Sequence, residues 1–598
     1  MYFLVLGALI GLFGAFQMLL RPRGSIRSFI IWWAVTALFW TFACWLFPFQ
    51  LVGPLGGFTL QIMLLVQFGF VAVFSGATGV IFDQELGYWK ARPWYATANS
   101  AFYGFAGLAA LMLATWFFTT SGMLHSDDYR VLVGESVKQG EWDKDVSVID
   151  PAHLRQVPIE MAKWKGNKAL SQAKGGALGS RFTIGEYTIQ RFGTELVWAA
   201  PIEFQGFSAW QAAGFTPGYV MVSAEDPDRD PVLVSDRELK YVDSAYFGDN
   251  LWRHVVTGNS ALDGLTDPTF ELDDEGNPFY VYTRYGLTVG YGGLDPVGAL
   301  IVNPETGEMS EYGVDDLPAW VDRIMPEAEA YKRMRWYGKY GEGWWNSVWG
   351  ENGVVTPTDD DLTLVWTDDG RACWFTGMTS TKSTDQALTA VILMDSRTGA
   401  VREYRVEGAA DEADVMGAVR SAVSNFSDWV PTPPIPENVY GKLAWIVPVV
   451  TTAGVPQRIA IVSADASNVA LGENVRQALA EYRRKTVEDG GRVVAEDSAT
   501  EARVVAAVER FAADVSAGNT VYLFTVAGNE RVFSGTSDVS AELPLTRAGD
   551  TVTIGFLETE ETVVQVDRFD NMAIDTRVSE AQSRASEIAA EQPLAAPR

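Results

Sequence analysis

The 598-residue chain has few of the side chains that usually carry metal or nucleophilic chemistry. Only two cysteines, Cys44 and Cys373, and three histidines, His125, His153 and His254, occur in the sequence, and all are far apart. Two such distant cysteines cannot form the disulfide framework that stabilises small exported domains. Because no H-E-x-x-H sequence and no Cys/His cluster with zinc spacing is present, we expect no metal and no other cofactor.

Catalytic fingerprints are also missing. No G-x-S-x-G, phosphate-loop or dinucleotide sequence stands in a fitting context. The aspartates at 226, 228 and 230 alternate in EDPDRDP, as at the start of a calcium loop, but the glycine and the distal glutamate of such a loop are absent. We therefore predict a solvated turn there, no catalytic residues, and a protein that is not an enzyme.

Positive charge is scarce as well, since the chain carries a formal net charge of −29. Residues 1–120 contain five Lys or Arg and two Asp or Glu, so the negative charge lies almost entirely after them. Nucleic-acid binding depends on basic side chains that neutralise phosphates, and we expect none here. A strongly acidic surface favours solubility, cation association or a basic partner.

The first 120 residues are apolar instead. Four segments, at roughly residues 3–20, 28–48, 58–82 and 99–119, are each long enough as a helix to cross a bilayer. No Asp, Glu, Lys or Arg interrupts them, which argues against an ion pathway. The sequence predicts a four-helix transmembrane anchor over residues 1–120, in contact with membrane lipids.

Short basic loops predict the orientation of this anchor. Arg21, Arg23 and Arg27 lie between the first two segments, and Lys90 and Arg92 lie between the last two. Basic loops stay on the cytoplasmic side. We therefore predict a multi-pass protein of the bacterial cell membrane whose large C-terminal region is extracytoplasmic.

Internal repetition organises the acidic region. The stretches NPETGEMSEY (303–312) and DSRTGAVREY (395–404) match at several offsets, and each follows an aromatic strand and an apolar strand. The matched turn residues are Thr306, Gly307 and Tyr312 in one copy and Thr398, Gly399 and Tyr404 in the other. Helical stretches are expected after them, at 316–336 and 411–424.

Looser copies flank this pair, where LVWAAP precedes GYVMVSA and LAWIVP precedes RIAIVSA. We predict tandem units of a strand hairpin packed on a helix, which bury one sheet face without a cofactor. The expected boundaries are a linker at 121–180 and repeat units at 181–260, 261–350, 351–430 and 431–486.

The Thr-Gly turn, set between an apolar strand ending in Asp or Asn and a strand ending in Tyr, resembles the PepSY family of extracytoplasmic modules. The likeness covers 290–425, and more loosely 190–485. It implies α+β units, often attached to membrane proteins and associated with binding or inhibiting peptidases. The wider layout, including RFTIGEYTIQ before LVWAAP, is similar to uncharacterised membrane proteins of bacteria and their large phages.

An aromatic segment, RWYGKYGEGWWNSVWG at 335–350, supplies the candidate partner-binding residues. They are Trp336, Tyr337, Tyr340, Trp344, Trp345 and Trp349. These rings could bind a glycan or a peptide, lie on the outer membrane leaflet, or fill the seam between adjacent repeats.

Residues 487–576 contain five short strand-like stretches, which predict a small OB-like β-barrel. It lacks a basic stripe, so a structural or protein-binding role is favoured. Residues 577–598 are rich in Ala, Glu and Gln and predict a flexible tail.

The sequence as a whole predicts a membrane-anchored α+β protein. We expect a non-enzymatic envelope scaffold or partner-binding module that forms a homo-oligomer. The alternatives are a PepSY-like regulator or inhibitor of an extracytoplasmic peptidase, with that peptidase as partner, and a protein that binds cell-wall glycan.

Overall fold

The computed structural model has a mixed α+β fold in two compact units, Met1–Tyr482 and Arg483–Arg598. It describes residues 2–16, 26–52, 57–83, 88–91, 95–133, 137–146, 148–150, 153–173, 178–258, 264–266, 268–359, 362–367, 370–381, 387–488, 501–516, 519–537, 539–557 and 563–574. The predicted tail at 577–598 and the basic positions 21, 23 and 92 lie outside these ranges.

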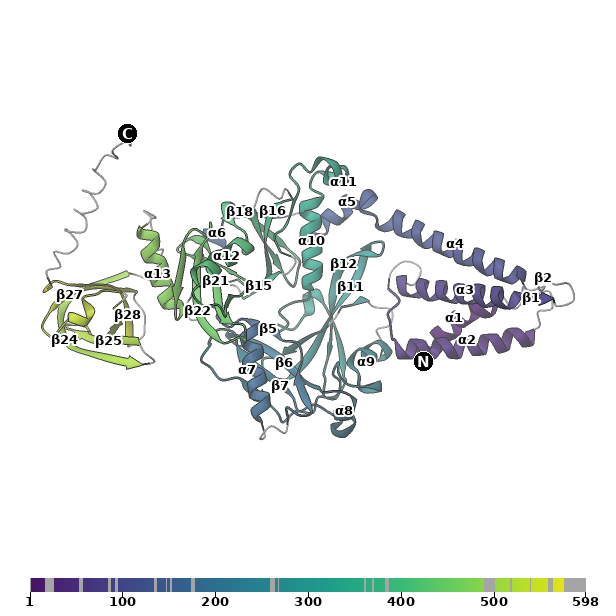
Figure 1. The fold of residues 1–598 in the computed structure, drawn as a ribbon, viewed down its shortest axis with the longest axis horizontal. Coiled ribbons are helices and arrows are strands. Elements are labelled where there is room, and N and C mark those ends of the chain that lie inside the picture. Colours follow the sequence, from purple (N-terminus) through teal and green to yellow (C-terminus); the bar gives the residue numbers. More distant parts are fainter. Residues whose placement is uncertain are drawn as a thin grey trace. The chain divides into compact units, whose positions relative to one another are not determined.

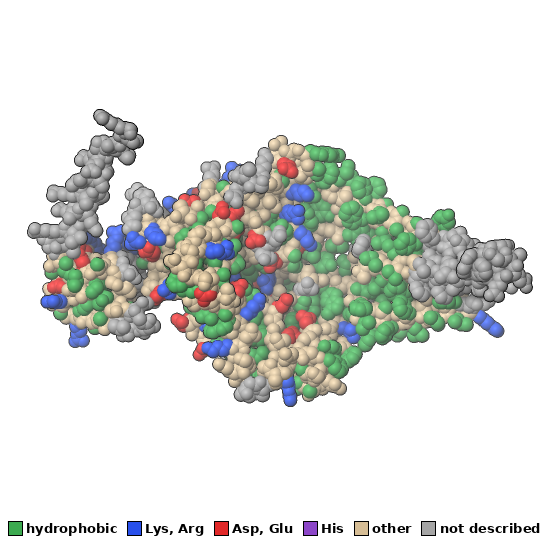
Figure 2. Space-filling model, viewed as in Figure 1, with side chains coloured by type: hydrophobic (Ala, Val, Ile, Leu, Met, Phe, Trp, Pro, Cys, Tyr) green, Lys and Arg blue, Asp and Glu red, His purple; other side chains and the backbone are tan. Residues whose placement is uncertain are grey.

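The apolar segments form helices (Figure 1). These are α1 (Tyr2–Phe16), α2 (Ile26–Leu46), α3 (Gly57–Gly79) and α4 (Tyr95–Thr120), with the hairpin β1 (Val80–Asp83) and β2 (Tyr88–Ala91) before α4. Among the described residues, two helices, α2 and α4, are long and apolar enough to cross a membrane. The apolar stretches of α1 and α3 are shorter, at Phe3–Leu12 and Thr59–Gly69. Figure 2 shows hydrophobic side chains gathered over these helices, whereas charged side chains lie over the β-rich part.

Small residues let α1 and α2 approach closely. A Cβ added at Gly7 would lie 2.5 Å from the Thr41 nitrogen, and one at Gly11 would lie 2.7 Å from the Ala37 nitrogen. At the same contact, the Trp33 indole donates to the Ala8 carbonyl at 2.9 Å. Small-residue faces of this kind pack apolar helices where no hydrophobic driving force acts between them.

Four antiparallel sheets follow, each a meander in which two short strands pair with the first long strand. The first sheet contains β4 (Phe182–Ile184), β5 (Thr188–Phe192), β6 (Glu195–Phe204), β7 (Tyr219–Ser223) and β8 (Val232–Val234). The second contains β9 (Gly264–Leu265), β10 (Thr269–Leu272), β11 (Pro278–Val289), β12 (Gly292–Val302) and β13 (Met309–Gly313).

The other two sheets have the same order. The third contains β14 (Val355–Pro357), β15 (Thr363–Trp366), β16 (Ala372–Ser380), β17 (Ala387–Asp395) and β18 (Val401–Ala410), and β3 (Lys138–Gly140) adds to β18 in parallel. The fourth contains β19 (Trp429–Pro431), β20 (Ile435–Val439), β21 (Lys442–Thr451), β22 (Pro456–Ser463) and β23 (Val469–Gly472).

Helices cover and separate the sheets. The longer ones are α5 (Gly122–Val131), α7 (Ile159–Gln172), α9 (Leu251–Gly258), α10 (Glu327–Lys339), α12 (Glu412–Ala422) and α13 (Val475–Glu488), and the shorter ones are α6 (Trp142–Asp145), α8 (Phe207–Ala213) and α11 (Gly343–Trp345). The expected helix at 316–336 is wrong in its start, because α10 begins only after Pro326. Proline at 318 and at 326 removes backbone donors from that stretch.

The largest core lies between the first and third sheets. It combines residues of β6 and β7, of β16 and β17, and of both α7 and α10. Its large buried side chains include Trp198, Met161, Trp374 and Met334. The other face of the first sheet packs on the second sheet and α9. The other face of the third sheet packs on the fourth sheet and α12. We refer to α7 with the first two sheets as the first half, and to α10 with the last two as the second half.

The C-terminal unit is β-rich. Its strands β24 (Glu501–Ser516), β25 (Asn519–Val526), β26 (Val532–Gly535), β27 (Thr551–Leu557) and β28 (Val563–Asn571) form a closed barrel in the order β24-β25-β26-β28-β27. All neighbours are antiparallel except β26 and β28, which pair in parallel. Inward-facing Phe524, Phe533 and Phe556 fill the interior and are at most 2% exposed.

Candidate functional site

The same local arrangement occurs once in each half. An Arg-x-Val-Pro sequence from Arg155 leads into α7, and an Arg-x-Met-Pro sequence from Arg323 leads into α10. In the first half the Trp198 indole donates to the valine carbonyl at 2.8 Å, and in the second half the Trp374 indole donates to the methionine carbonyl at 2.8 Å. Each guanidinium lies near the corresponding indole, at 5.1 Å in the first half and 5.8 Å in the second.

Backbone contacts repeat in the same way. The N–H groups of Gln156 and the next residue donate to the Ala224 carbonyl, both at 2.9 Å. Those of Ile324 and the next residue donate to the Ser396 carbonyl at 3.0 and 2.8 Å. Because a proline follows each pair, the backbone turns at the same point and α7 and α10 begin in the same relation to their sheets.

A cavity of about 340 Å³ lies between these two arrangements. Its charged and aromatic lining residues are Arg155, Glu160, Tyr187, Trp198, Arg323, Glu327, Asp359, Trp374, Phe375 and Glu412. Residues 432–435, at the start of the fourth sheet, also line it. The cavity therefore draws on both halves, and neither half forms it alone.

Several residues that line this cavity carry buried polar atoms without a hydrogen-bond partner. Among the described residues, the Nε atoms of Arg155 and Arg323, the Tyr187 hydroxyl and the Oε2 atom of Glu412 are buried and have no hydrogen-bond partner. Glu412 is 8% exposed, and its other oxygen accepts from the Gly377 N–H at 3.1 Å. Buried polar groups are normally satisfied, so these four atoms are exceptions that cluster in the residues around one cavity.

Burial also changes the acidity of the lining groups. It lowers the pKa of Arg155 to about 10, with Glu160 opposing the change. Burial likewise lowers the pKa of Arg323, against the opposing charges of Glu271, Asp322 and Glu327, and it raises the pKa of Glu412. Both guanidiniums remain charged at neutral pH, so the cavity offers N–H donors and carboxylate oxygens between two indole walls. Such a lining binds groups with both donors and acceptors, as a peptide has.

The residues of this cavity were not among the predicted site residues. Neither arginine belongs to a known motif, and they are separated by more than 160 positions. One sequence pattern could have indicated it. An arginine, any residue, a hydrophobic residue and a proline stand in that order before α7 and again before α10. Each occurrence is followed, further along the chain, by a strand hairpin with a tryptophan in its second strand, which strengthens that pattern.

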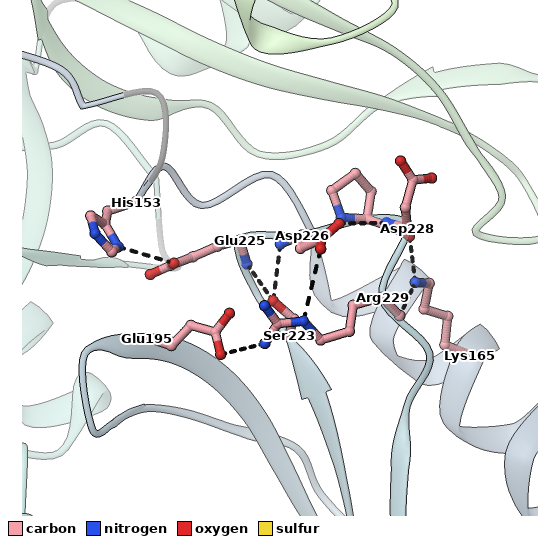
Figure 3. A network of polar contacts seen from close by, with 9 residues as sticks. His153, Lys165, Glu195, Ser223, Glu225, Asp226, Asp228 and Arg229 are labelled. Carbon is pink, nitrogen blue, oxygen red and sulfur yellow. Dashed lines mark hydrogen bonds and ion pairs between the residues drawn. The ribbon is translucent and has the colours of Figure 1, made fainter. Parts of the chain in front are cut away.

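The alternating aspartates at 226–230 lie in a loop that hydrogen bonds and ion pairs hold in place (Figure 3). The Lys165 ammonium, only 8% exposed, donates to the carbonyls of Pro227 and Arg229. Arg229 in turn pairs with Glu195 and lies 3.8 Å from Asp226. No group of three His, Cys, Asp or Glu in the described part of the protein is arranged to hold a metal ion.

The predicted turn residues adopt one conformation in the two central repeats. In the first, the Asn303 side chain accepts from the N–H groups of Glu305 and Thr306 at 2.8 and 3.1 Å, and Gly307 has a φ of 77°. The second turn copies this, since the Asp395 side chain accepts from the residues two and three positions later at 3.0 and 2.9 Å. Gly399 there has a φ of 70°.

These turn residues are structural in their contacts. Thr306 and Thr398 each accept from an N–H two residues on, at 3.2 and 3.3 Å. Tyr404 is 1% exposed and packs edge-on against Trp142, while Tyr312 is half-buried.

The predicted aromatic segment divides in two. Trp336 lies 4.4 Å from the Tyr129 ring of α5, and the Tyr337 hydroxyl donates to Glu403 at 2.8 Å. Tyr340 is 7% exposed, and Trp344 packs in the same cluster. Trp336, Tyr340 and Trp344 therefore join α10 and α11 to α5, whereas Tyr337 joins α10 to β18.

The other two rings of the segment face solvent. Trp345 and Trp349 are 55% and 71% exposed and stack on each other at 4.6 Å with a 10° interplanar angle. The segment is therefore neither wholly packed nor wholly an exposed platform.

No protein-family model matches this sequence, and no curated protein matches it. Weak structural likenesses exist to cobalt-substituted Synechocystis ACO (8% identity, 50% of this chain and 51% of that protein, TM-score 0.12). Two others are BT0996 in a complex with RGII (10%, 65% and 90%, TM-score 0.15) and the major Malassezia sympodialis allergen Mala s 1 (11%, 51% and 78%, TM-score 0.11). The chain spans about half the length of the first. At these TM-scores the likenesses assign neither a family nor a function.

Proposed function

We propose that the protein is a non-enzymatic, membrane-anchored envelope protein that binds a protein partner through its extracytoplasmic repeat region. The observation that carries this proposal is the cavity between the two halves, which Arg155 and Arg323 line and beside which their Nε atoms are buried without a hydrogen-bond partner. An extended peptide segment of the partner occupies the cavity, where the arginine side chains and the carboxylates of the lining supply donors and acceptors for its backbone.

A four-helix anchor is the finer form of the membrane attachment that we propose. Support comes from the tight contact of α1 with α2 and from a buried hydrogen bond of 2.6 Å between the Trp40 indole and Gln67 of α3. A polar pair of this kind ties helices together in hydrocarbon. The short basic loops favour an extracytoplasmic repeat region.

We further propose that the repeat units are PepSY-like and that the C-terminal barrel is OB-like. The shared turns at Asn303 and Asp395 support the first assignment. The strand order of the barrel, with one parallel pair between β26 and β28, supports the second. The partner of such a protein is another envelope protein, a second copy of itself, or a peptidase that it regulates.

Site-specific photocrosslinking in the cells that make the protein tests partner binding. A photoreactive phenylalanine analogue replaces Ile159 on the cavity wall, and Ser421 on the exposed surface of α12 is the matched control position. We expect a crosslinked product of defined mass from position 159 and none from position 421. The substitutions Arg155→Met and Arg323→Met together should reduce that product at least fivefold, whereas Lys163→Met, on the exposed side of α7, should not.

The identity of the product separates the candidate partners. A product at twice the mass of the protein indicates a homo-oligomeric scaffold, and a product that contains a peptidase indicates a regulator. Equal labelling at positions 159 and 421, or a product that does not respond to the arginine substitutions, would argue against binding in the cavity.

A further inference from the structure

Aromatic side chains of the repeat region gather where α2 ends. The Trp45 ring of α2 stacks on Phe247 at 6.2 Å with a 17° interplanar angle, and the Arg253 guanidinium lies 4.6 Å from the same ring. The Trp252 indole donates to the Pro48 carbonyl at 3.0 Å. The loop before α9 and α9 itself are therefore fixed to the end of a helix that is long and apolar enough to cross a membrane.

This first cluster leaves its rings in solvent. Phe247 is 50% exposed, and its neighbours Phe207 and Tyr246 are 43% and 37% exposed and lie 5.1 Å apart. Phe247 also has a φ of 53°, a left-handed conformation that a bulky residue adopts only at a cost. A large, half-exposed apolar ring therefore stands beside the end of α2.

A second cluster stands where α4 ends. The chain continues from α4 into α5, and Gly122 at this junction is so close to Tyr340 and Trp344 that an added Cβ would lie 2.4 Å from the tyrosine hydroxyl. Next to these packed rings, the stacked pair Trp345 and Trp349 is exposed. The hydrophobic surface in Figure 2 continues from the apolar helices onto this part of the molecule.

We infer that these two clusters rest in the interfacial layer of the same bilayer that α2 and α4 cross. The occupant is lipid, because both clusters directly continue the apolar surface of helices that meet lipid along their length. Aromatic rings are favoured at the level of the headgroups, where one part is apolar and the surroundings are wet. The inference rests on the membrane attachment proposed above and assigns a specific membrane-facing surface to the repeat region.

The two clusters form two separate contacts with the bilayer. Each is joined to a different helix end, and together they set the orientation of the repeat region relative to the bilayer. The region after residue 120 carries a strongly negative net charge, which anionic headgroups repel, so ring burial is the main source of this contact.

Fluorescence quenching by spin-labelled lipid tests the inference on the full-length protein in nanodiscs. Cys44 and Cys373 are first replaced by Ala, and single cysteines carrying an environment-sensitive dye are introduced as Phe247→Cys and Trp349→Cys. Leu38→Cys, at a 69% exposed position inside α2, reports membrane insertion through quenching by lipids labelled in the acyl chain, and Ser421→Cys reports solvent. We expect lipids labelled near the headgroup to quench the dye at 247 and 349 at least threefold more than at 421.

The outcomes separate the inference from the proposal on which it rests. Quenching at 38 together with solvent-like values at both 247 and 349 would overturn the inference while membrane insertion stands. A solvent-like value at 38 would overturn membrane insertion and the inference with it. Trp345→Cys is a second reporter of the α4 cluster, and an unchanged melting temperature relative to the cysteine-free protein shows that each variant folds.

Discussion

Glu203 provides a pH-dependent test of the packing between the first and second sheets. It lies on β6, is 8% exposed, and accepts hydrogen bonds from the Ser244 hydroxyl and from the Ser244 N–H at 3.0 Å. The Tyr280 hydroxyl of the second sheet donates to its other oxygen at 3.3 Å. Burial raises the pKa of Glu203 from 4.5 to about 7, although these hydrogen bonds lower it.

The sign of the effect follows from proton binding. The carboxyl group binds its proton more tightly in the folded than in the unfolded protein, so folding takes up a proton between pH 4.5 and about 7. Stability from this group is therefore full below pH 4.5 and is lost as the pH rises to about 7. A pKa difference of that size corresponds to roughly 3 kcal/mol.

Glu203→Gln should remove this pH dependence. The amide keeps the shape of the side chain, its oxygen still accepts from Ser244, and it carries no charge at any pH. We expect the variant and the parent protein to have similar melting temperatures near pH 5. Near pH 8 the variant should melt about 3–6 °C higher, because the parent has then lost roughly 3 kcal/mol of unfolding free energy that the variant keeps.

Thermal unfolding of the full-length protein in mild detergent, followed by fluorescence at pH 5, 6, 7 and 8, measures this difference. Glu308→Gln, at an exposed position, is the matched control and should give no pH-dependent difference. A constant difference in melting temperature between Glu203→Gln and the parent across that pH range would contradict the raised pKa, since the buried carboxyl would then titrate as in the unfolded protein.

Three further predictions concern the repeated features and the helices. Trp198→Phe and Trp374→Phe should each reduce the free energy of unfolding by about 1–2 kcal/mol, because each removes one equivalent buried hydrogen bond; unequal losses of more than threefold would contradict their equivalence. Gly399→Ala, at φ 70°, should destabilise by about 1 kcal/mol in chemical denaturation, whereas Ala466→Gly, at φ 56°, should stabilise by a similar amount; the same sign for both would be evidence against the turn assignment. Gly11→Leu should separate α1 from α2 and lower the melting temperature in detergent, and an unchanged value would argue against that helix contact.

Local features were readable in the sequence because they depend on neighbouring residues. The turns at Asn303 and Asp395 need an acceptor side chain, two following N–H groups and a glycine with positive φ, all within five positions. The apolar composition of α2 and α4 follows directly from consecutive residues. The strands of the C-terminal barrel were likewise visible as short alternating stretches between turn residues.

Tertiary structure alone decided the site and the surfaces. Arg155 and Arg323 line one cavity only because two halves pack through a common core. The stretch Lys138–Gly140, expected in a linker, adds a strand to β18 more than 260 residues later. Within one aromatic segment, Tyr340 is buried and Trp349 is exposed, a difference that composition does not contain. Hydropathy and turn chemistry act over a few residues and so are written in the sequence, whereas which faces meet depends on the simultaneous burial of segments far apart in the sequence.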